Sequence, residues 1–257
     1  VLGSRGLGDV YKRQVQGETC AIKDISLDIP KGSFVSVVGP SGCGKSTLLS
    51  IIAGIIRPDS GRILINGRDI SPGNDSIGYM LQHDHLFEWR SIYGNVMLGL
   101  EIKRRKKPDD TSYVDELLKR YGLGEFKASR PSELSGGMRQ RAALIRTLAL
   151  EPEILLLDEP FSALDYQTRL TVCDDIYSII KKEHKTAVLV THDLSEAISV
   201  GDTVYVLSRR PGRIARSVSV DFPADLTPLM RRNAPEFKDY FNILWNCLLY
   251  TSPSPRD

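Results

Sequence analysis

The hydrophobic residues of this chain fall into short runs and periodic stretches that predict alternating strands and helices. Continuous apolar runs at residues 34–38, 154–157 and 187–190 predict buried strands, and residues 25–29 alternate as a half-buried strand does. The same rules place strands at residues 62–65, 77–81 and 203–207, and helices at 45–53, 91–102, 111–121, 138–150, 167–182 and 194–200. Because strands that alternate with helices favour a mostly parallel sheet covered on both faces, we predict an α/β fold.

The pattern changes between about residues 87 and 150, where only helical periodicity is found. We expect this stretch to form a helical subdomain inserted in the α/β domain. After Val220, three prolines lead to an apolar stretch at residues 241–245. This tail predicts a C-terminal helix packed on the core, because there is too little chain for a regulatory domain.

The composition is that of an ordinary globular protein. The 257 residues are 41% hydrophobic and 26% charged, which excludes a disordered chain and a small disulfide scaffold. The longest nearly apolar run, residues 48–56, is far shorter than the ~20 residues that cross a bilayer, and we expect no export leader. Four scattered cysteines without metal-ligand spacing suggest free thiols in a reducing compartment. A formal net charge of +2 gives no reason to expect a nucleic acid partner.

The two ends of the chain are related to each other at the level of DNA. Residues 4–14 and 247–257 back-translate to opposite strands of one segment, offset by a nucleotide at each end. We interpret them as translated sequencing-adapter remnants, so residues 1–14 and 247–257 are set apart from one predicted domain at residues 15–246. Their four basic and two acidic side chains account for the whole net charge of +2.

A glycine-rich segment follows the predicted strand at residues 34–38. Its sequence, GPSGCGKST at residues 39–47, fits the phosphate-loop pattern G-x-x-x-x-G-K-[ST], with a strand before it and a helix after it. The glycines let successive backbone N–H groups surround a polyphosphate at the positive end of a helix. Lys45 would bind the β- and γ-phosphate oxygens, and the Ser46 hydroxyl would ligate Mg²⁺. The segment predicts a nucleoside triphosphate site.

Two carboxylates end the predicted strand at residues 154–157. The carboxyl ends of parallel strands form the edge of a sheet where ligands bind. Asp158 suits direct or water-mediated Mg²⁺ binding, and Glu159 suits polarising a water for attack on the γ-phosphate. The pair predicts that the nucleotide is hydrolysed.

Further motifs occur in the order found in one protein family. The segment LSGGMRQR at residues 134–141 resembles the signature of ABC-type ATPases, which no other phosphate-loop class contains. Gln82 follows a predicted strand as the family's Q-loop does, SALD at residues 162–165 resembles its D-loop, and His192 in VTHD resembles its switch histidine. The resemblance covers nearly all of residues 15–210. It implies a P-loop NTPase (RecA-like) fold with a mostly parallel sheet core, an antiparallel β subdomain and an inserted α-helical subdomain.

The resemblance also implies how ATP is bound. In this family two copies enclose ATP in each of two interfaces. The phosphates would lie on the phosphate loop of one copy and against the signature of the other. The phosphate loop residues are Gly39, Pro40, Ser41, Gly42, Cys43, Gly44, Lys45, Ser46 and Thr47. The signature residues are Ser135, Gly136 and Gly137.

The remaining site residues take their roles from the same resemblance. Gln82 would contact Mg²⁺ and the attacking water, and Asp158 would also bind the metal. His192 would hold the γ-phosphate and support Glu159, and Asp165 would order the site of the partner copy. The implied cofactors are ATP and Mg²⁺.

Softer features point to a subfamily. Trp89, the MRQR run at residues 138–141 and SRRPGRI at residues 208–214 resemble the ATPases of nitrate/sulfonate/taurine-type importers. This resemblance implies a peripheral protein on the cytoplasmic face of the cell membrane that energises import of a small anionic solute. Its partners would be a second copy, two membrane-spanning permease subunits and a separate solute-binding protein. Phe87 and Trp89 are either permease contacts or core aromatics of the helical subdomain.

Some residues near these motifs have alternative interpretations. We interpret His83 and His85 as loop residues, because no further metal ligand lies nearby in the sequence. The five basic residues at 103–107 indicate a solvated helix end or, alternatively, a contact with anionic lipid. Cys43 in the phosphate loop would make activity sensitive to alkylation.

The N-terminus departs from the family pattern. The family carries an aromatic residue that stacks on adenine, on a strand that precedes residue 25. Because the domain is taken to begin at Val15, we expect that strand to be lost and Tyr11 to stack only by accident. ATP binding weaker than that of the full-length parent would follow.

Other functions remain as alternatives. An importer ATPase for another small solute would look the same, because partners choose the solute. A soluble ABC ATPase of DNA repair usually has a long insertion between the phosphate loop and the signature, which lie close here, at Thr47 and Ser135. A ribosome-acting ABC protein needs two cassettes. A regulatory module without turnover is disfavoured by Glu159 and His192.

Overall fold

The computed structural model describes residues 2–3, 10–14, 17–70, 75–104 and 108–251, and the basic residues 105–107 lie outside this part. It divides into two compact units. The first consists of Val1–Asn74 and His184–Asp257, and the second of Asp75–Glu183. The two units are described in turn.

The first unit is built on a sheet with the strand order β12-β11-β5-β10. The strands are β5 (Phe34–Val38), β10 (Thr186–Thr191), β11 (Thr203–Leu207) and β12 (Ile214–Ser219). β10 and β11 run parallel to β5, and only β12 is antiparallel to its neighbour. β5 and β10 are buried along their whole length, which explains their continuous apolar sequence.

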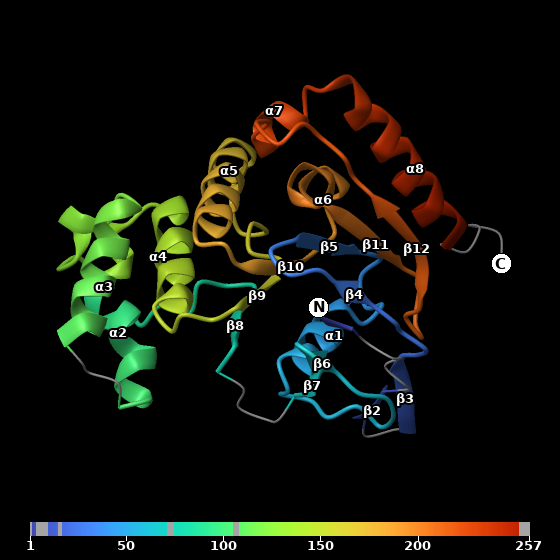
Figure 1. Ribbon diagram of the computed structural model, residues 1–257, viewed down its shortest axis with the longest axis horizontal. Helices are drawn as coiled ribbons and strands as arrows, with labels where there is room; N and C mark the ends of the chain where they lie inside the picture. Colours follow the sequence, from blue (N-terminus) through green and yellow to red (C-terminus); the bar gives the residue numbers. More distant parts are fainter. Residues whose placement is uncertain (1, 4–9, 15–16, 71–74, 105–107, 252–257) are drawn as a thin grey trace. The chain divides into compact units, whose positions relative to one another are not determined.

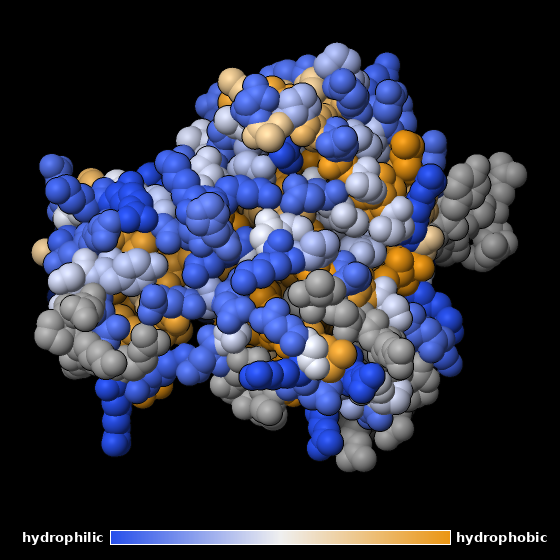
Figure 2. Space-filling view, in the orientation of Figure 1, coloured by the Kyte–Doolittle hydropathy of each residue, from blue (hydrophilic) through white to orange (hydrophobic). Residues whose placement is uncertain are grey.

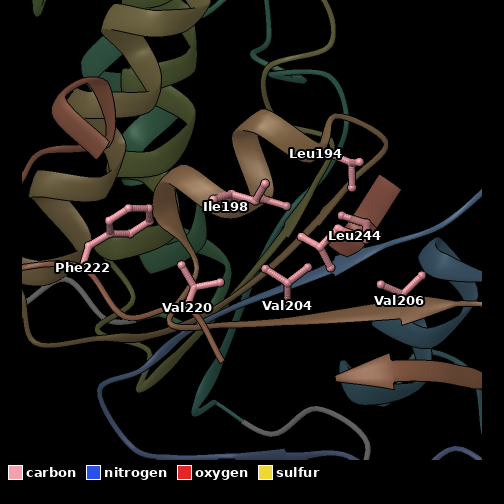
Figure 3. Close-up of a cluster of buried hydrophobic side chains, with 9 residues drawn as sticks. Leu194, Ile198, Val204, Val206, Val220, Phe222 and Leu244 are labelled. Carbon is pink, nitrogen blue, oxygen red and sulfur yellow. The ribbon is translucent and has the colours of Figure 1, made fainter. Parts of the chain in front are cut away.

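Helices cover both faces of this sheet. Figure 1 shows α6 (Leu194–Val200) and α8 (Pro235–Thr251) above it and α1 (Lys45–Ile52) below it; α7 (Pro228–Arg231) leads into α8. Figure 3 shows the buried cluster between β11, α6 and α8, in which Leu194 and Ile198 of α6 meet Val204 and Leu244. This packing anchors α6, and therefore the turn that precedes it, to the sheet.

Three short antiparallel pairs complete the first unit. They are β1 (Leu2–Gly3) with β4 (Asp28–Ile29), β2 (Val10–Gln14) with β3 (Gly17–Ile22), and β6 (Leu64–Ile65) with β7 (Arg68–Asp69). The turn between β6 and β7 has positive φ at Asn66 (50°) and Gly67 (77°), as a two-residue hairpin requires.

The strand that we expected to be lost before residue 25 is present as a pair. β2 includes Tyr11, whose backbone lies opposite Cys20 of β3. α8 likewise extends to Thr251, and Cys247 and Leu248 pack against the cluster in Figure 3. Residues assigned to adapter remnants therefore take part in regular structure; their origin stays a prediction.

The second unit combines two parallel strands with helices. β8 (Ile77–Met80) pairs with β9 (Ile154–Asp158), with Met80 opposite Leu157. The helices are α2 (Ile92–Ile102), α3 (Pro108–Arg120), α4 (Gly136–Leu148) and α5 (Tyr166–Lys182), with short 3₁₀ turns at Gly124–Phe126 and Pro131–Glu133. α4 packs on α2, α5 and β8.

The α/β fold with mostly parallel central strands is confirmed. β5, α6 and β11 have the predicted bounds, and α1 ends one residue early because Ala53 is its C-cap. Some predictions were wrong: the strands expected at residues 25–29 and 62–65 form only at their last two residues, α4 begins at Gly136 instead of Met138, and β12 was not expected. Hydrophilic residues predominate on the face drawn in Figure 2, because the apolar runs form the interior.

Candidate functional site

The phosphate loop joins β5 to α1 in the first unit. Gly42 and Gly44 have positive φ, 76° and 108°, so the backbone turns sharply before the first helical residue, Lys45. A Cβ atom on Gly44 would lie 2.5 Å from Cγ2 of Ile22. Glycine at residue 44 is therefore required by conformation and by space, and its place before α1 puts the free backbone N–H groups of a helix at the loop.

Lys45 is held across the loop. Its side chain is buried, and Nζ donates hydrogen bonds to the carbonyl oxygens of Gly39 (2.8 Å) and Pro40 (3.1 Å). These bonds compensate the cost of burying an ammonium group. The cation is thereby positioned at the loop, while the side chain of Ser46, one residue further on, is exposed.

Gly212 supports the same loop from the β11–β12 connection. Its N–H donates to the carbonyl of Ala21 (3.0 Å), its carbonyl accepts from Lys23 N (2.9 Å), and a Cβ on it would lie 2.2 Å from the carbonyl oxygen of Cys43. The sequence places Gly212 in the segment 208–214, which was singled out only as a subfamily feature, and no role at the phosphate loop was predicted for it. In sequence the Pro-Gly pair indicates a turn, and nothing local indicates what the turn touches.

His192 follows the last residue of β10, Thr191. Asp193 caps α6 by accepting hydrogen bonds from the N–H groups of Ser195 (2.7 Å) and Glu196 (3.2 Å). The Thr191 hydroxyl donates to the buried Glu196 carboxylate and accepts from Asp193 N. Both neighbours of the exposed His192 are therefore bonded to α6. Glu196 was also missed, since an acidic residue in a first helical turn normally indicates only a dipole interaction.

The second unit holds the two carboxylates. Asp158 is the buried last residue of β9 and accepts a hydrogen bond from the Tyr79 hydroxyl (3.3 Å). Glu159 follows with a positive φ of 44°. Its carbonyl accepts bonds from the backbone N (3.1 Å) and hydroxyl (3.0 Å) of Ser162. This turn directs the chain out of the strand at Glu159.

Gln82 lies at the same end of the strand pair. β8 is parallel to β9 with Met80 opposite Leu157, so both strands end at the same edge, and Gln82 follows β8 by two residues. The Gln82 side chain is exposed. The chain therefore leaves β8 toward Gln82 at the edge where β9 ends in Asp158.

The signature motif forms the beginning of α4. Ser135 is the N-cap, and its hydroxyl accepts a hydrogen bond from Met138 N (3.3 Å). A Cβ on Gly137 would lie 2.8 Å from Cγ2 of Val172 in α5, and one on Gly136 would lie 3.0 Å from Leu164. The helix therefore begins two residues earlier than predicted, because the two glycines let its first turn pack closely on α5 and the preceding loop.

Asp165 is the N-cap of α5. Its carboxylate accepts a hydrogen bond from Thr168 N (3.1 Å), and hydrogen bonds with Thr168 hold the pKa of the carboxyl below its usual value. The side chain is exposed, so it is ionised at neutral pH. In each unit the predicted residues thus lie at strand ends or helix N-termini.

The donor set fits Mg²⁺. Among the described residues there is no group of three or more His, Cys, Asp and Glu side chains that would hold a metal by themselves. The candidates Ser46, Gln82 and Asp158 all offer oxygen atoms, which Mg²⁺ prefers, and this ion is usually held by one or two carboxylates together with phosphates and waters. A nucleotide-bound Mg²⁺ needs no larger cluster of protein ligands.

Comparisons with known proteins identify the family. The ABC transporter family model matches residues 22–162. The chain is 48% identical to the ABC transporter ATP-binding protein YtlC of Bacillus subtilis over 90% of this chain and 89% of that protein. This chain belongs to the ABC transporter family. It is an ATP-binding subunit of a transporter, and it hydrolyses ATP coupled to transport.

Two further members of the ABC family are informative. The taurine import ATP-binding protein TauB of Roseobacter denitrificans is 40% identical, over 88% of this chain and 87% of TauB. The dimeric, post-hydrolysis structure of an ATP-binding cassette bound to ADP and Pi has a TM-score of 0.72 at 29% identity, and it covers 87% of this chain and 100% of that one. The P-loop NTPase fold class is thereby confirmed.

The aromatic pair after Gln82 lies partly on the surface. The rings of Phe87 and Trp89 are 4.6 Å apart, and Trp89 is 72% exposed. Trp89 is therefore not a core aromatic of the helical region, and of the two alternatives only a surface role is left for it. No helix in the described ranges is long and apolar enough to cross a membrane.

Proposed function

We propose that this ABC subunit energises the import of a small anionic solute of the nitrate, sulfonate or taurine class. It acts as a dimer with two permease subunits and a separate binding protein, on the cytoplasmic face of the membrane. The similarity to TauB supports an importer of this class. The exposed Trp89, close in sequence to Gln82, supports a contact between the Q-loop region and a permease.

The proposed hydrolysis begins when the phosphate loop takes up ATP. Lys45 exchanges its bonds with the Gly39 and Pro40 carbonyls for the β- and γ-phosphate oxygens, so the ammonium group remains satisfied throughout. Mg²⁺, when bound by Ser46, Gln82 and Asp158, supplies charge neutralisation on the phosphates. Glu159 accepts a proton from the attacking water, and His192 holds the γ-phosphate.

A second copy completes each ATP site in this proposal. Ser135 is exposed and is the N-cap of α4, and the N-terminus of a helix is suited to binding an anion from another molecule. ATP would then bridge two surfaces, and Asp165 would order the site of the partner. The observation that carries the proposal is that one chain contains both a complete phosphate loop and a signature motif at the N-terminus of α4.

The decisive experiment is to measure the mass of Glu159→Gln by light scattering with and without Mg-ATP. The substitution keeps the size of the side chain and removes the base, so an ATP-bound dimer should accumulate and the mass should double. Glu153→Gln, just before β9, is the matched control and should hydrolyse ATP like the unmodified chain. A Glu159→Gln variant that hydrolyses ATP at the normal rate, or that binds ATP and stays monomeric, contradicts the proposed mechanism.

The solute class needs a separate test. The chain can replace TauB in proteoliposomes with the other components of the Roseobacter denitrificans taurine importer, and ATP hydrolysis is then measured with and without taurine. We expect stimulation by taurine, and a loss of that stimulation in Trp89→Ala with basal hydrolysis unchanged. Equal rates with and without taurine, from a chain that does bind the permease, would contradict the proposed solute class.

A further inference from the structure

Two arginines of α4 bind the segment that follows Gln82. Arg146 donates from Nη2 to the carbonyl of Asp84 and from Nη1 to the carbonyl of His85, each over 2.7 Å. Arg139 donates from Nε to the Asp84 carboxylate over 3.2 Å. All of these residues belong to the second unit. The Q-loop is therefore tied to the helix that begins with the signature.

The backbone of this segment needs that support. His85 has a positive φ of 46°, which is unfavourable for a residue other than glycine and persists only where the surroundings impose it. Asp84 Oδ1 closes the turn by accepting from Leu86 N (3.1 Å). The fork of a guanidinium group matches two successive carbonyl oxygens, whereas an ammonium group would bind as a point charge.

The second arginine continues the connection to the signature. Besides Asp84, Arg139 binds the carbonyl of Leu134 through Nη1 over 3.1 Å. Leu134 immediately precedes Ser135, the N-cap of α4. One guanidinium group thus joins the segment after Gln82 to the first residue of the signature.

The contribution of these contacts is geometric more than energetic. The side chains of Arg139 and Asp84 are 36% and 27% exposed, and ion pairs at such exposure contribute little to stability. Arg146 is more deeply placed: burial lowers the pKa of its guanidinium, and the nearby Asp84 opposes that change. Its hydrogen bonds to the carbonyl oxygens of Asp84 and His85 offset the cost of burying the guanidinium group.

We propose that Arg139 and Arg146 are positioning residues that make the Q-loop and the signature motif move as one body. In the proposed dimer, Gln82 serves one ATP and the signature of the same chain serves the other, so this clamp would set the geometry of both sites together. The inference rests on the proposed function for that consequence. The clamp itself is a property of the single chain.

The first test measures the clamp in the nucleotide-free chain by amide hydrogen exchange. Arg146→Lys keeps the charge but loses the fork, so amide exchange at Leu86, next to the two held carbonyls, should be faster by about tenfold. Arg231→Lys is the matched control, because Arg231 also donates to a backbone carbonyl, that of Ser199 in α6. Unchanged exchange at the Q-loop in Arg146→Lys overturns the proposal.

The second test measures catalysis. In Arg146→Lys the Mg²⁺ concentration for half-maximal hydrolysis should rise about fivefold and kcat should fall, while binding of a fluorescent ATP analogue stays within about twofold, because the phosphate loop is untouched. Arg139→Lys, at a more exposed position, should change the Mg²⁺ dependence and kcat in the same direction but less. It replaces Arg146→Lys in this test if that variant does not fold. A normal Mg²⁺ dependence in both variants overturns the proposal.

The two proposals fail in different ways. If Glu159→Gln binds ATP but does not dimerise, the dimer mechanism is wrong, and hydrogen exchange still decides whether the clamp exists. If Glu159→Gln dimerises and Glu159→Gln/Arg146→Lys dimerises at the same ATP concentration with unchanged exchange, only the clamp is wrong.

Discussion

The hydroxyl of Thr191 donates a hydrogen bond of 2.6 Å to the carboxylate of Glu196, and both side chains are buried. The same hydroxyl accepts a bond from Asp193 N over 3.0 Å. His192 lies between these two bonded residues at the end of β10, and α6 is fixed in turn by the cluster in Figure 3. The backbone on both sides of His192 is therefore held by side-chain hydrogen bonds to the following helix.

Thr191→Val tests this arrangement. Valine has a similar shape but no hydroxyl, so the Asp193 amide loses its acceptor and Glu196 loses a donor. We expect unfolding in urea to show a loss of about 1–3 kcal/mol. We expect kcat to fall at least about tenfold with ATP binding unchanged, because the histidine is misplaced and the phosphate loop is intact. Thr191→Ser retains the hydroxyl and should keep most of the activity; equal rates in the two variants would show that the bond does not position His192.

Gly44→Ala should impair folding and ATP binding together. The residue has a φ of 108°, and the new methyl group would lie 2.5 Å from Ile22. Gly32→Ala is the control, because Gly32 has a φ of 77° and nothing within 4 Å. We expect Gly32→Ala to cost about 1 kcal/mol from the backbone alone, and Gly44→Ala to cost at least about 2 kcal/mol more, since steric overlap in a packed core adds to it. Denaturant titration gives both values, and equal losses would rule out the steric clash.

Alkylation of Cys43 should be slow at neutral pH. Burial raises the pKa of this thiol, although Lys45 partly opposes the effect. Below the raised pKa the reactive thiolate is scarcer than in an ordinary cysteine. The rate of alkylation by iodoacetamide, followed by mass spectrometry, should still be rising with pH above the usual value of about 8.5. Modification should abolish ATP hydrolysis, whereas Cys43→Ser should be active and resistant.

The same shift has a consequence for stability. Because the pKa is raised in the folded state, the neutral thiol is favoured there, and its contribution is fully present below the unfolded value. Stability should fall as pH rises above that value, and Cys43→Ser should lose this part of the pH dependence. A rate of Cys43 alkylation that stops rising at pH 8 would contradict the raised pKa on which both predictions rest.

Buried elements that are flanked by turn or capping residues were predictable from the sequence. β5 and β11 are short apolar runs that end at turns, and α6 begins after a capping aspartate, so hydrophobic pattern and local signals agree. The phosphate loop was found for the same reason: its glycines, lysine and serine are contiguous, and each is needed for a local conformation or a direct contact with phosphate.

Elements whose formation depends on a neighbouring element were missed. β12 has the sequence IARSVS, and most of its residues are exposed. It forms a strand because it pairs with β11 at the edge of the sheet. This pairing cannot be detected from the hydrophobic periodicity of β12 itself. The start of α4 was misplaced since glycines are poor helix formers, and the close packing of Gly137 against Val172 overrides that preference.

The sequence by itself determined the chemistry: the phosphate loop, the two carboxylates, the signature and the family to which they belong, because these motifs are runs of adjacent residues with fixed spacing. Only the tertiary structure decided what holds them in place. Gly212 against the phosphate loop and Arg146 on the Q-loop act through contacts between segments far apart along the chain, and Glu196 acts through a side-chain hydrogen bond to Thr191, five residues earlier. Such contacts depend on how the strands and helices pack, and a pattern of neighbouring residues does not encode them in a readable form.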